Sequence, residues 1–131
     1  MCGVYFYPKE LKVSENHFKN LLIHRGPDYQ NKIEINNFVI GHNLLSIRGG
    51  IEISSQPYKI DNNYLLSFNG EIYNTNAIIN EFNLKKSLSD TNILAQLITK
   101  KGKDFINYID GMYAIILFDI FKKEVSIYRD H

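Results

Sequence analysis

The chain has no tryptophan and a single cysteine among its 131 residues. One cysteine cannot form an intrachain disulfide, so a small secreted scaffold held by disulfides is excluded. No apolar run approaches the roughly 18 residues that a membrane-spanning helix needs. The first seven residues also lack the basic start and the long apolar stretch of a secretory signal peptide. We therefore expect a protein of the reducing cytoplasm with no membrane partner.

The sequence also lacks an excess of either positive or negative charge. Fifteen Lys and Arg stand against 14 Asp and Glu, which leaves a formal net charge of +1. Like charges gather only in short pairs such as Lys100-Lys101, so the sequence predicts no nucleic-acid partner. With 44% hydrophobic residues, a chain of 131 residues can bury one core, which favours a single domain.

The one cysteine stands at position 2, where removal of Met1 would make it the N-terminal residue, with Gly3 behind it. A thiol attacks carbonyl carbons as the thiolate, and its unperturbed pKa is about 8.5. A free α-amino group, with a pKa of about 7.7 to 8.0, is a base suited to neutral pH. Cys2 could thus supply both the nucleophile and its base.

The hydrophobic pattern mixes strands and helices. Apolar and β-branched runs predict strands at 3–7, 38–42, 64–68, 112–119 and 124–129. Helical spacing predicts helices from residue 14 to a break at 25–28, at 76–82 and at 90–100, the last capped by Ser89 or Asp90. Asn69-Gly70 reads as a turn after its strand. Together these elements predict an α+β sandwich.

Eight short motifs go further than the periodicity. They are MCG at 1–3, HRGPD at 24–28, GH at 41–42 with LSI at 45–47, QP at 56–57, NGEIYN at 69–74, SDT at 89–91, DGMYA at 110–114 and RDH at 129–131. In this order they resemble the class II glutamine amidotransferase domain of N-terminal-nucleophile type, most closely the glutamine-hydrolysing lobe of asparagine synthetases. The resemblance implies an αββα sandwich of antiparallel sheets flanked by helices.

The resemblance also implies roles for particular residues. Cys2 would attack the side-chain amide of L-glutamine, and Asn69 with Gly70 would stabilise the oxyanion. Glu71 and Asp90 match the acids that bind the substrate ammonium. Two alternatives stay open here, because Asn69-Gly70 could simply form a hairpin turn and Asp90 could simply cap a helix.

One position departs from the family pattern. The family carries Gly-His-any-Arg-Leu-Ser-Ile, with the arginine on the substrate carboxylate, and Leu44 occupies the place of that arginine. Leucine cannot replace a bidentate guanidinium. We hypothesise that Arg48, next to Ile47 at the substrate site, reaches the carboxylate instead. The alternative is that Arg48 faces solvent and glutamine binding is weakened.

The remaining expectations concern ligands and partners. His24 and His42 lie at no metal-ligand spacing, so no metal site is expected, and Arg25 and Asp28 are expected to fix their loop. The family domain is longer than this chain, so we expect residues 1–131 to be an incomplete N-terminal portion of it, truncated at the C-terminus. No cofactor is expected here, because ATP and magnesium would belong to a separate synthetase domain or subunit that accepts the ammonia. A catalytically silent scaffold and a hydrolase of another amide remain alternatives.

Overall fold

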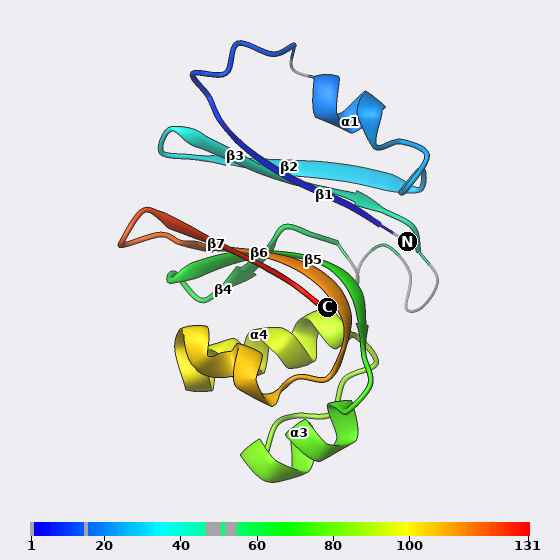
Figure 1. Ribbon diagram of the computed structural model, residues 1–131, viewed down its shortest axis with the longest axis vertical. Helices are drawn as coiled ribbons and strands as arrows, with labels where there is room; N and C mark the ends of the chain where they lie inside the picture. The colour runs from blue at the N-terminus through cyan, green and yellow to red at the C-terminus, as the bar shows by residue number, and fades with distance from the viewer. Residues whose placement is uncertain (1, 15, 47–50, 52–54) are drawn as a thin grey trace.

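A computed structural model describes residues 2–14, 16–46, 51 and 55–131. The fold is α+β, with two antiparallel sheets and few helices, as the sequence predicts. The first sheet has the strand order β1-β3-β2 and the second has the order β4-β5-β6-β7. Figure 1 shows the two sheets stacked on each other, with α1 outside the first sheet and the other helices outside the second.

The first sheet contains β1 (Gly3–Pro8), β2 (Tyr29–Ile35) and the central β3 (Phe38–Leu44). Side chains alternate between its faces because successive residues of a strand point to opposite sides. The outer face presents three buried residues, Tyr5, Tyr7 and Val39. These residues pack against Phe18 in the short helix α1 (His17–Leu21) and against Leu22 just after it.

The second sheet contains β4 (Tyr58–Ile60), β5 (Tyr64–Ile72), β6 (Gly111–Asp119) and β7 (Glu124–Arg129). Its outer face is covered by α4 (Asp90–Lys101) and the 3-10 helix η1 (Gly102–Tyr108), and α3 (Thr75–Phe82) packs against α4 beyond the end of β5. The main core lies here, with Leu66, Ile115 and Leu117 of the sheet against the apolar side of α4. Apolar burial of this kind is the main stabilising term of a fold.

A second core joins the two sheets. Ile40 of β3, Leu65 of β5, and Ile116 and Phe118 of β6 are all buried there, and Phe6 of β1 packs against them. Leu65 and Leu66 thus belong to different cores although they are neighbours in sequence. Strand β6 is covered on both faces, as its continuous apolar run predicts.

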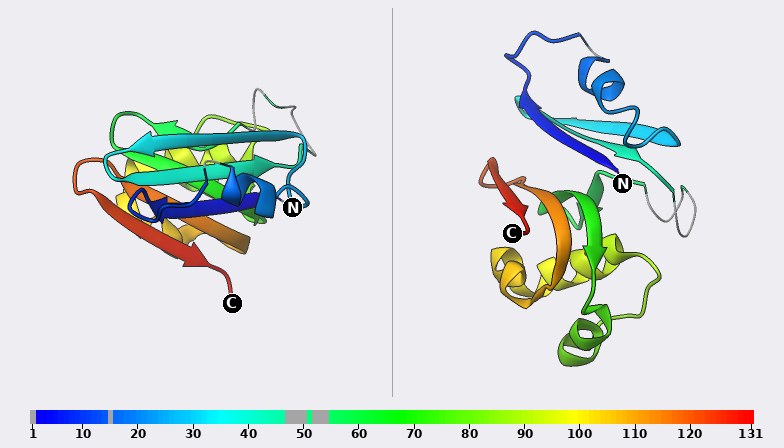
Figure 2. Two further views of the ribbon diagram at one scale, coloured as in Figure 1. Left: turned by 90° about the horizontal axis from the view of Figure 1, so that it is seen from above. Right: turned by 45° about the vertical axis from the view of Figure 1, so that its right-hand side comes forward.

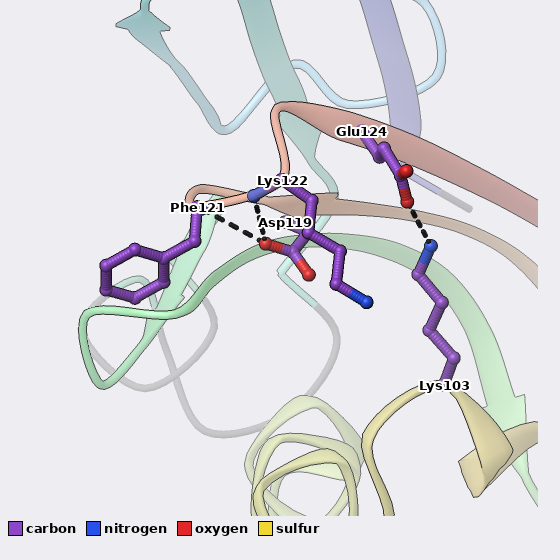
Figure 3. Close-up of polar contacts among 5 residues, drawn as sticks. All are labelled: Lys103, Asp119, Phe121, Lys122 and Glu124. Atoms are coloured by element: carbon purple, nitrogen blue, oxygen red, sulfur yellow. Dashed lines mark hydrogen bonds and ion pairs between the residues drawn. The ribbon is translucent and has the colours of Figure 1, made fainter.

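The connection between β6 and β7 is closed by Asp119, whose Oδ1 accepts hydrogen bonds from the backbone N–H groups of Phe121 (3.0 Å) and Lys122 (2.8 Å) (Figure 3). An aspartate that accepts from residues two and three positions ahead forms an Asx turn. Glu124 then forms an ion pair of 3.0 Å with Lys103 of η1. Both side chains of the pair are exposed to solvent, so it contributes little.

The five predicted strands are confirmed, and so are the helices at 76–82 and 90–100 within one or two residues. The predicted turn at Asn69-Gly70 is wrong, because β5 continues to Ile72. The first helix is shorter than predicted, and the sequence pattern missed β2, β4 and η1. Among the described residues, no helix is both long enough and apolar enough to cross a membrane.

Candidate active site

The site lies where the two sheets open at one end. Cys2 precedes Val4 by two residues, so its side chain falls on the face of β1 that looks toward the second sheet. By the same alternation Asn69 and Glu71 follow Leu65 onto the inward face of β5, and Leu44 follows Ile40 on β3. Residues far apart in the sequence therefore converge on the gap between the sheets.

A cavity of about 290 Å³ occupies this end of the molecule. Its walls include Cys2, Leu44, Asn69, Gly70, Glu71 and Asp90. All five predicted site residues that the structure describes are thus brought together. The two others, Ile47 and Arg48, lie outside the described residues.

Cys2 is half-buried, and two residues that are distant in the sequence donate hydrogen bonds to it. The backbone N–H of Leu45 donates to Sγ at 3.4 Å, and the Nε of Arg25 donates to the carbonyl oxygen of Cys2 at 3.4 Å. Gly3 is close to Leu22, since a Cβ built on Gly3 would lie 3.0 Å from the Cβ of Leu22. The loop after α1 therefore packs directly on the start of the chain.

That loop carries the HRGPD motif, and Asp28 of the motif links the start of β2 to the end of β3. The N–H of Asp28 donates to the carbonyl oxygen of Leu44 at 3.1 Å, and its Oδ2 accepts from the N–H of Ser46 at 2.8 Å. Gly26 lies against the backbone of Asn43 with no room for a Cβ. Arg25 and Asp28 thus both bind backbone groups, in line with the predicted loop-fixing role.

Gly70 cannot be exchanged for another residue without strain. A Cβ at this position would collide with the carbonyl oxygen of Met112, and the backbone φ of Gly70 is +156°. Gly70 pairs with Tyr113 inside the continuous β5–β6 ladder, which brings the two backbones this close. Glycine is thus required by close backbone approach and not by a hairpin turn.

Asp90 links the start of α4 to the end of β5. Its Oδ2 accepts a hydrogen bond from the backbone N–H of Ile72 at 3.0 Å, whereas the helix is capped by Ser89, whose Oγ accepts from the N–H of Asn92 at 3.4 Å. Of the two capping candidates, Ser89 is therefore the cap. Asp90 is tied to the strand that carries Asn69 and Glu71.

Gln56 supports the same region, although its sequence context predicts no function for it. It is buried, its Oε1 accepts from the N–H of Phe68 at 2.6 Å, and its Nε2 donates to the Oγ1 of Thr91 at 3.1 Å. Gln56 also lines the cavity. The side chain thus joins β5 to α4 beside the site, and the only signal for it was the QP motif.

His42 lies between the sheets and is only 1% exposed. Burial lowers the pKa of its imidazole to about 4, although the hydrogen bond to Phe68 opposes the shift. The partner of Nε2 is the carbonyl oxygen of Phe68 at 3.2 Å, so Nε2 carries the proton of a neutral ring. His42 therefore links β3 to β5 through this hydrogen bond. No cluster of three or more metal-ligating side chains occurs among the described residues.

The electrostatics of the cavity are one-sided. Glu71 and Asp90 are the only charged residues among its described lining residues, and both are acidic. Leu44 forms part of the wall at 3% exposure, beside Leu45. The cavity therefore combines a thiol, an amide side chain and two carboxylates with an apolar wall.

The sequence matches a family model over its whole length and known proteins over nearly all of it. Residues 1–131 match a family model described as a glutamine amidotransferase domain. The chain is 32% identical to asparagine synthetase B [glutamine-hydrolyzing] of Escherichia coli, over 93% of this chain and 23% of that protein. It is 37% identical to a probable asparagine synthetase [glutamine-hydrolyzing] of Schizosaccharomyces pombe, over 99% of this chain and 25% of that protein.

The chain spans about a quarter of the length of these curated relatives. Within that span the MCG, NGEIYN and SDT motifs all supply residues to one cavity. The match of the whole sequence to one family model and this shared cavity agree, and the chain belongs to the glutamine amidotransferase domain family.

Proposed function

We propose that this domain hydrolyses the side-chain amide of L-glutamine to glutamate and ammonia, with Cys2 as the N-terminal nucleophile. The observation that carries the proposal is the single cavity shared by Cys2, Asn69, Gly70, Glu71 and Asp90. Two curated relatives are named as glutamine-hydrolyzing enzymes, which supports the same chemistry.

In this mechanism Met1 is first removed, which frees the α-amino group of Cys2. That amine accepts the thiol proton while Sγ bonds to the amide carbon of the substrate. The side-chain amide of Asn69 and the backbone N–H of Gly70 donate to the resulting oxyanion. Collapse of the tetrahedral intermediate breaks the C–N bond, and the leaving nitrogen takes the proton and departs as ammonia.

A water molecule then attacks the thioester, breaks the C–S bond and releases the new carboxylic acid. Throughout both steps the exposed Glu71 and the half-buried Asp90 hold the substrate ammonium through opposite charge and charge-assisted hydrogen bonds. The ammonia acceptor would be a synthetase domain or subunit, and ATP chemistry would belong to that partner. The layers support an N-terminal-nucleophile αββα sandwich, since helices cover the outer faces of both sheets.

The test is glutamate release from glutamine by protein whose N-terminus has been verified by mass. We expect Cys2→Ser to abolish release and Asn69→Ala to lower kcat by about 100-fold or more, because one oxyanion donor is lost. Asn62→Ala, an exposed position in the turn after β4, is the matched control and should leave kcat unchanged. A folded protein with a free Cys2 amine that releases no glutamate would contradict the proposal and favour a silent scaffold.

A further inference from the structure

Both charged groups that line the cavity carry a negative charge. Glu71 and Asp90 supply them, and none of the described lining residues is Lys, Arg or His. A carboxylate that enters this cavity meets two negative groups, and the part of its wall seen here offers it no cation. Like charges repel, so these two carboxylates disfavour a bound carboxylate even though Glu71 is exposed to solvent.

The same wall suits an ammonium and a neutral group well. An ammonium offers three N–H donors and a positive charge, and the two carboxylates match both properties. Leu44 and Leu45 present apolar surface close to Cys2, because the Leu45 N–H contacts the Cys2 sulfur at 3.4 Å. An uncharged carbonyl group attached to the α-carbon, which carries the ammonium, can lie against such a wall at little cost in free energy.

We infer that the cavity prefers glutamine amides whose α-ammonium is free but whose neighbouring acid group is neutral, as in the N-terminal glutamine residue of a peptide. This inference rests on the proposed amide hydrolysis and specifies its substrate class. The reaction converts the side-chain amide and one water into a side-chain carboxylic acid and ammonia, with no oxidant or further reactant.

The size and mouth of the cavity fit this substrate class. A volume of about 290 Å³ is at the lower end of the range for small-ligand pockets, so one residue fits and a folded protein does not. Leu88 also lines the cavity and is 85% exposed, which places it at the rim. The rest of a peptide would leave past this rim into solvent.

The experiment compares three substrates on Met1-free protein: L-glutamine, glutaminyl-glycine N-methylamide, and the same amide with its amino group acetylated. The expected result is a kcat/KM at least tenfold higher for glutaminyl-glycine N-methylamide than for glutamine. Acetylation should lower kcat/KM at least tenfold, since the acids then lose their ammonium. The glutamyl product is identified by mass, which separates it from the cyclised peptide, and Cys2→Ser protein provides the blank.

A variant pair localises the preference. Leu44→Arg adds a cation to the wall and should shift the kcat/KM ratio at least tenfold toward glutamine, whereas Leu44→Met keeps the volume apolar and should not. If Leu44→Arg fails to fold, the wild-type comparison still decides. The competing hypothesis is that Arg48 holds the carboxylate. It predicts that Arg48→Ala lowers kcat/KM for glutamine and leaves kcat/KM for the peptide amide unchanged.

The outcomes separate the inference from the proposed function. Equal or better turnover of glutamine by the wild type overturns the inference and leaves the glutaminase standing. A glutamine preference that disappears in Arg48→Ala overturns it as well and assigns the carboxylate to Arg48. Absence of Cys2-dependent hydrolysis of all three substrates overturns the proposed function, and the inference falls with it.

Discussion

His42 makes the stability of this domain depend on pH. Its folded pKa of about 4 lies below the ordinary value of 6.5 because burial disfavours the charged ring. The unfolded chain therefore binds the proton more readily than the folded protein does. The contribution of His42 to the free energy of unfolding is fully present above pH 6.5 and is lost as the pH falls toward 4. By linkage, the loss between pH 7 and pH 5 is about 2 kcal/mol.

The check is the free energy of urea unfolding at pH 7 and pH 5 for the wild type and for His42→Gln. Glutamine does not titrate and has an N–H that can reach the carbonyl oxygen of Phe68, so its unfolding energy should fall by about 2 kcal/mol less between these pH values. Other titrating groups are common to both proteins and cancel in the difference. Equal pH dependence in the two proteins would show that His42 does not titrate as its burial predicts.

At the residue level, the cavity residues that belong to a motif were predictable, as were the loop contacts of Arg25 and Asp28, whereas Gln56 was not. Cys2, Asn69, Gly70, Glu71 and Asp90 follow from motif resemblance, and the structure gathers them in one cavity. Gln56 was missed because a buried glutamine acquires its role only when β5 and α4 come together. A contact over 35 positions of sequence leaves no periodic signal in the chain.

Among the elements, Asn74 connects the end of β5 and the start of α3 to the segment between η1 and β6. Its Nδ2 donates to the carbonyl oxygen of Tyr108 at 2.9 Å, and its Oδ1 accepts from the N–H of Asp110 at 2.9 Å. We expect Asn74→Ala to lower the free energy of unfolding by about 2 kcal/mol, since two hydrogen bonds are lost.

Denaturant unfolding measures this effect, and two further variants test its cause. Asn74→Asp keeps the acceptor for Asp110 but loses the donor to Tyr108, so its loss should be intermediate. Asn76→Ala changes an exposed asparagine in the same helix and should not destabilise. A loss in Asn74→Ala no greater than in Asn76→Ala would refute the connecting role.

Element prediction succeeded where one strand or helix carries its own pattern. The apolar run of β6 and the helical spacing of α4 are local signals, and both elements occur where predicted. Asn69-Gly70 failed because pairing with Ala114 and Tyr113 outweighs the local turn preference of the dipeptide. Strand β4 has three residues and too little alternation to detect.

At the scale of the whole molecule, the two sheets differ in width, and this leaves apolar surface open. Ile127 of β7 pairs with Ile116 and Val125 pairs with Phe118, so all four point toward the first sheet. Ile116 and Phe118 are buried, whereas Ile127 is 68% and Val125 is 38% exposed. Figure 2 agrees, because in its left view β7 lies beyond the edge of the first sheet at β1.

An exposed apolar strand at a sheet edge favours association between molecules. We therefore expect the double variant Val125→Thr with Ile127→Thr to reduce concentration-dependent self-association, measured by sedimentation velocity. Threonine keeps β-branching, so β7 should persist and the unfolding energy should change by no more than about 1 kcal/mol. Leu11→Thr changes one exposed apolar residue in the loop after β1 and is the control. Only the double variant alters the open face of β7. If the double variant and Leu11→Thr both associate like the wild type, that face does not cause the self-association.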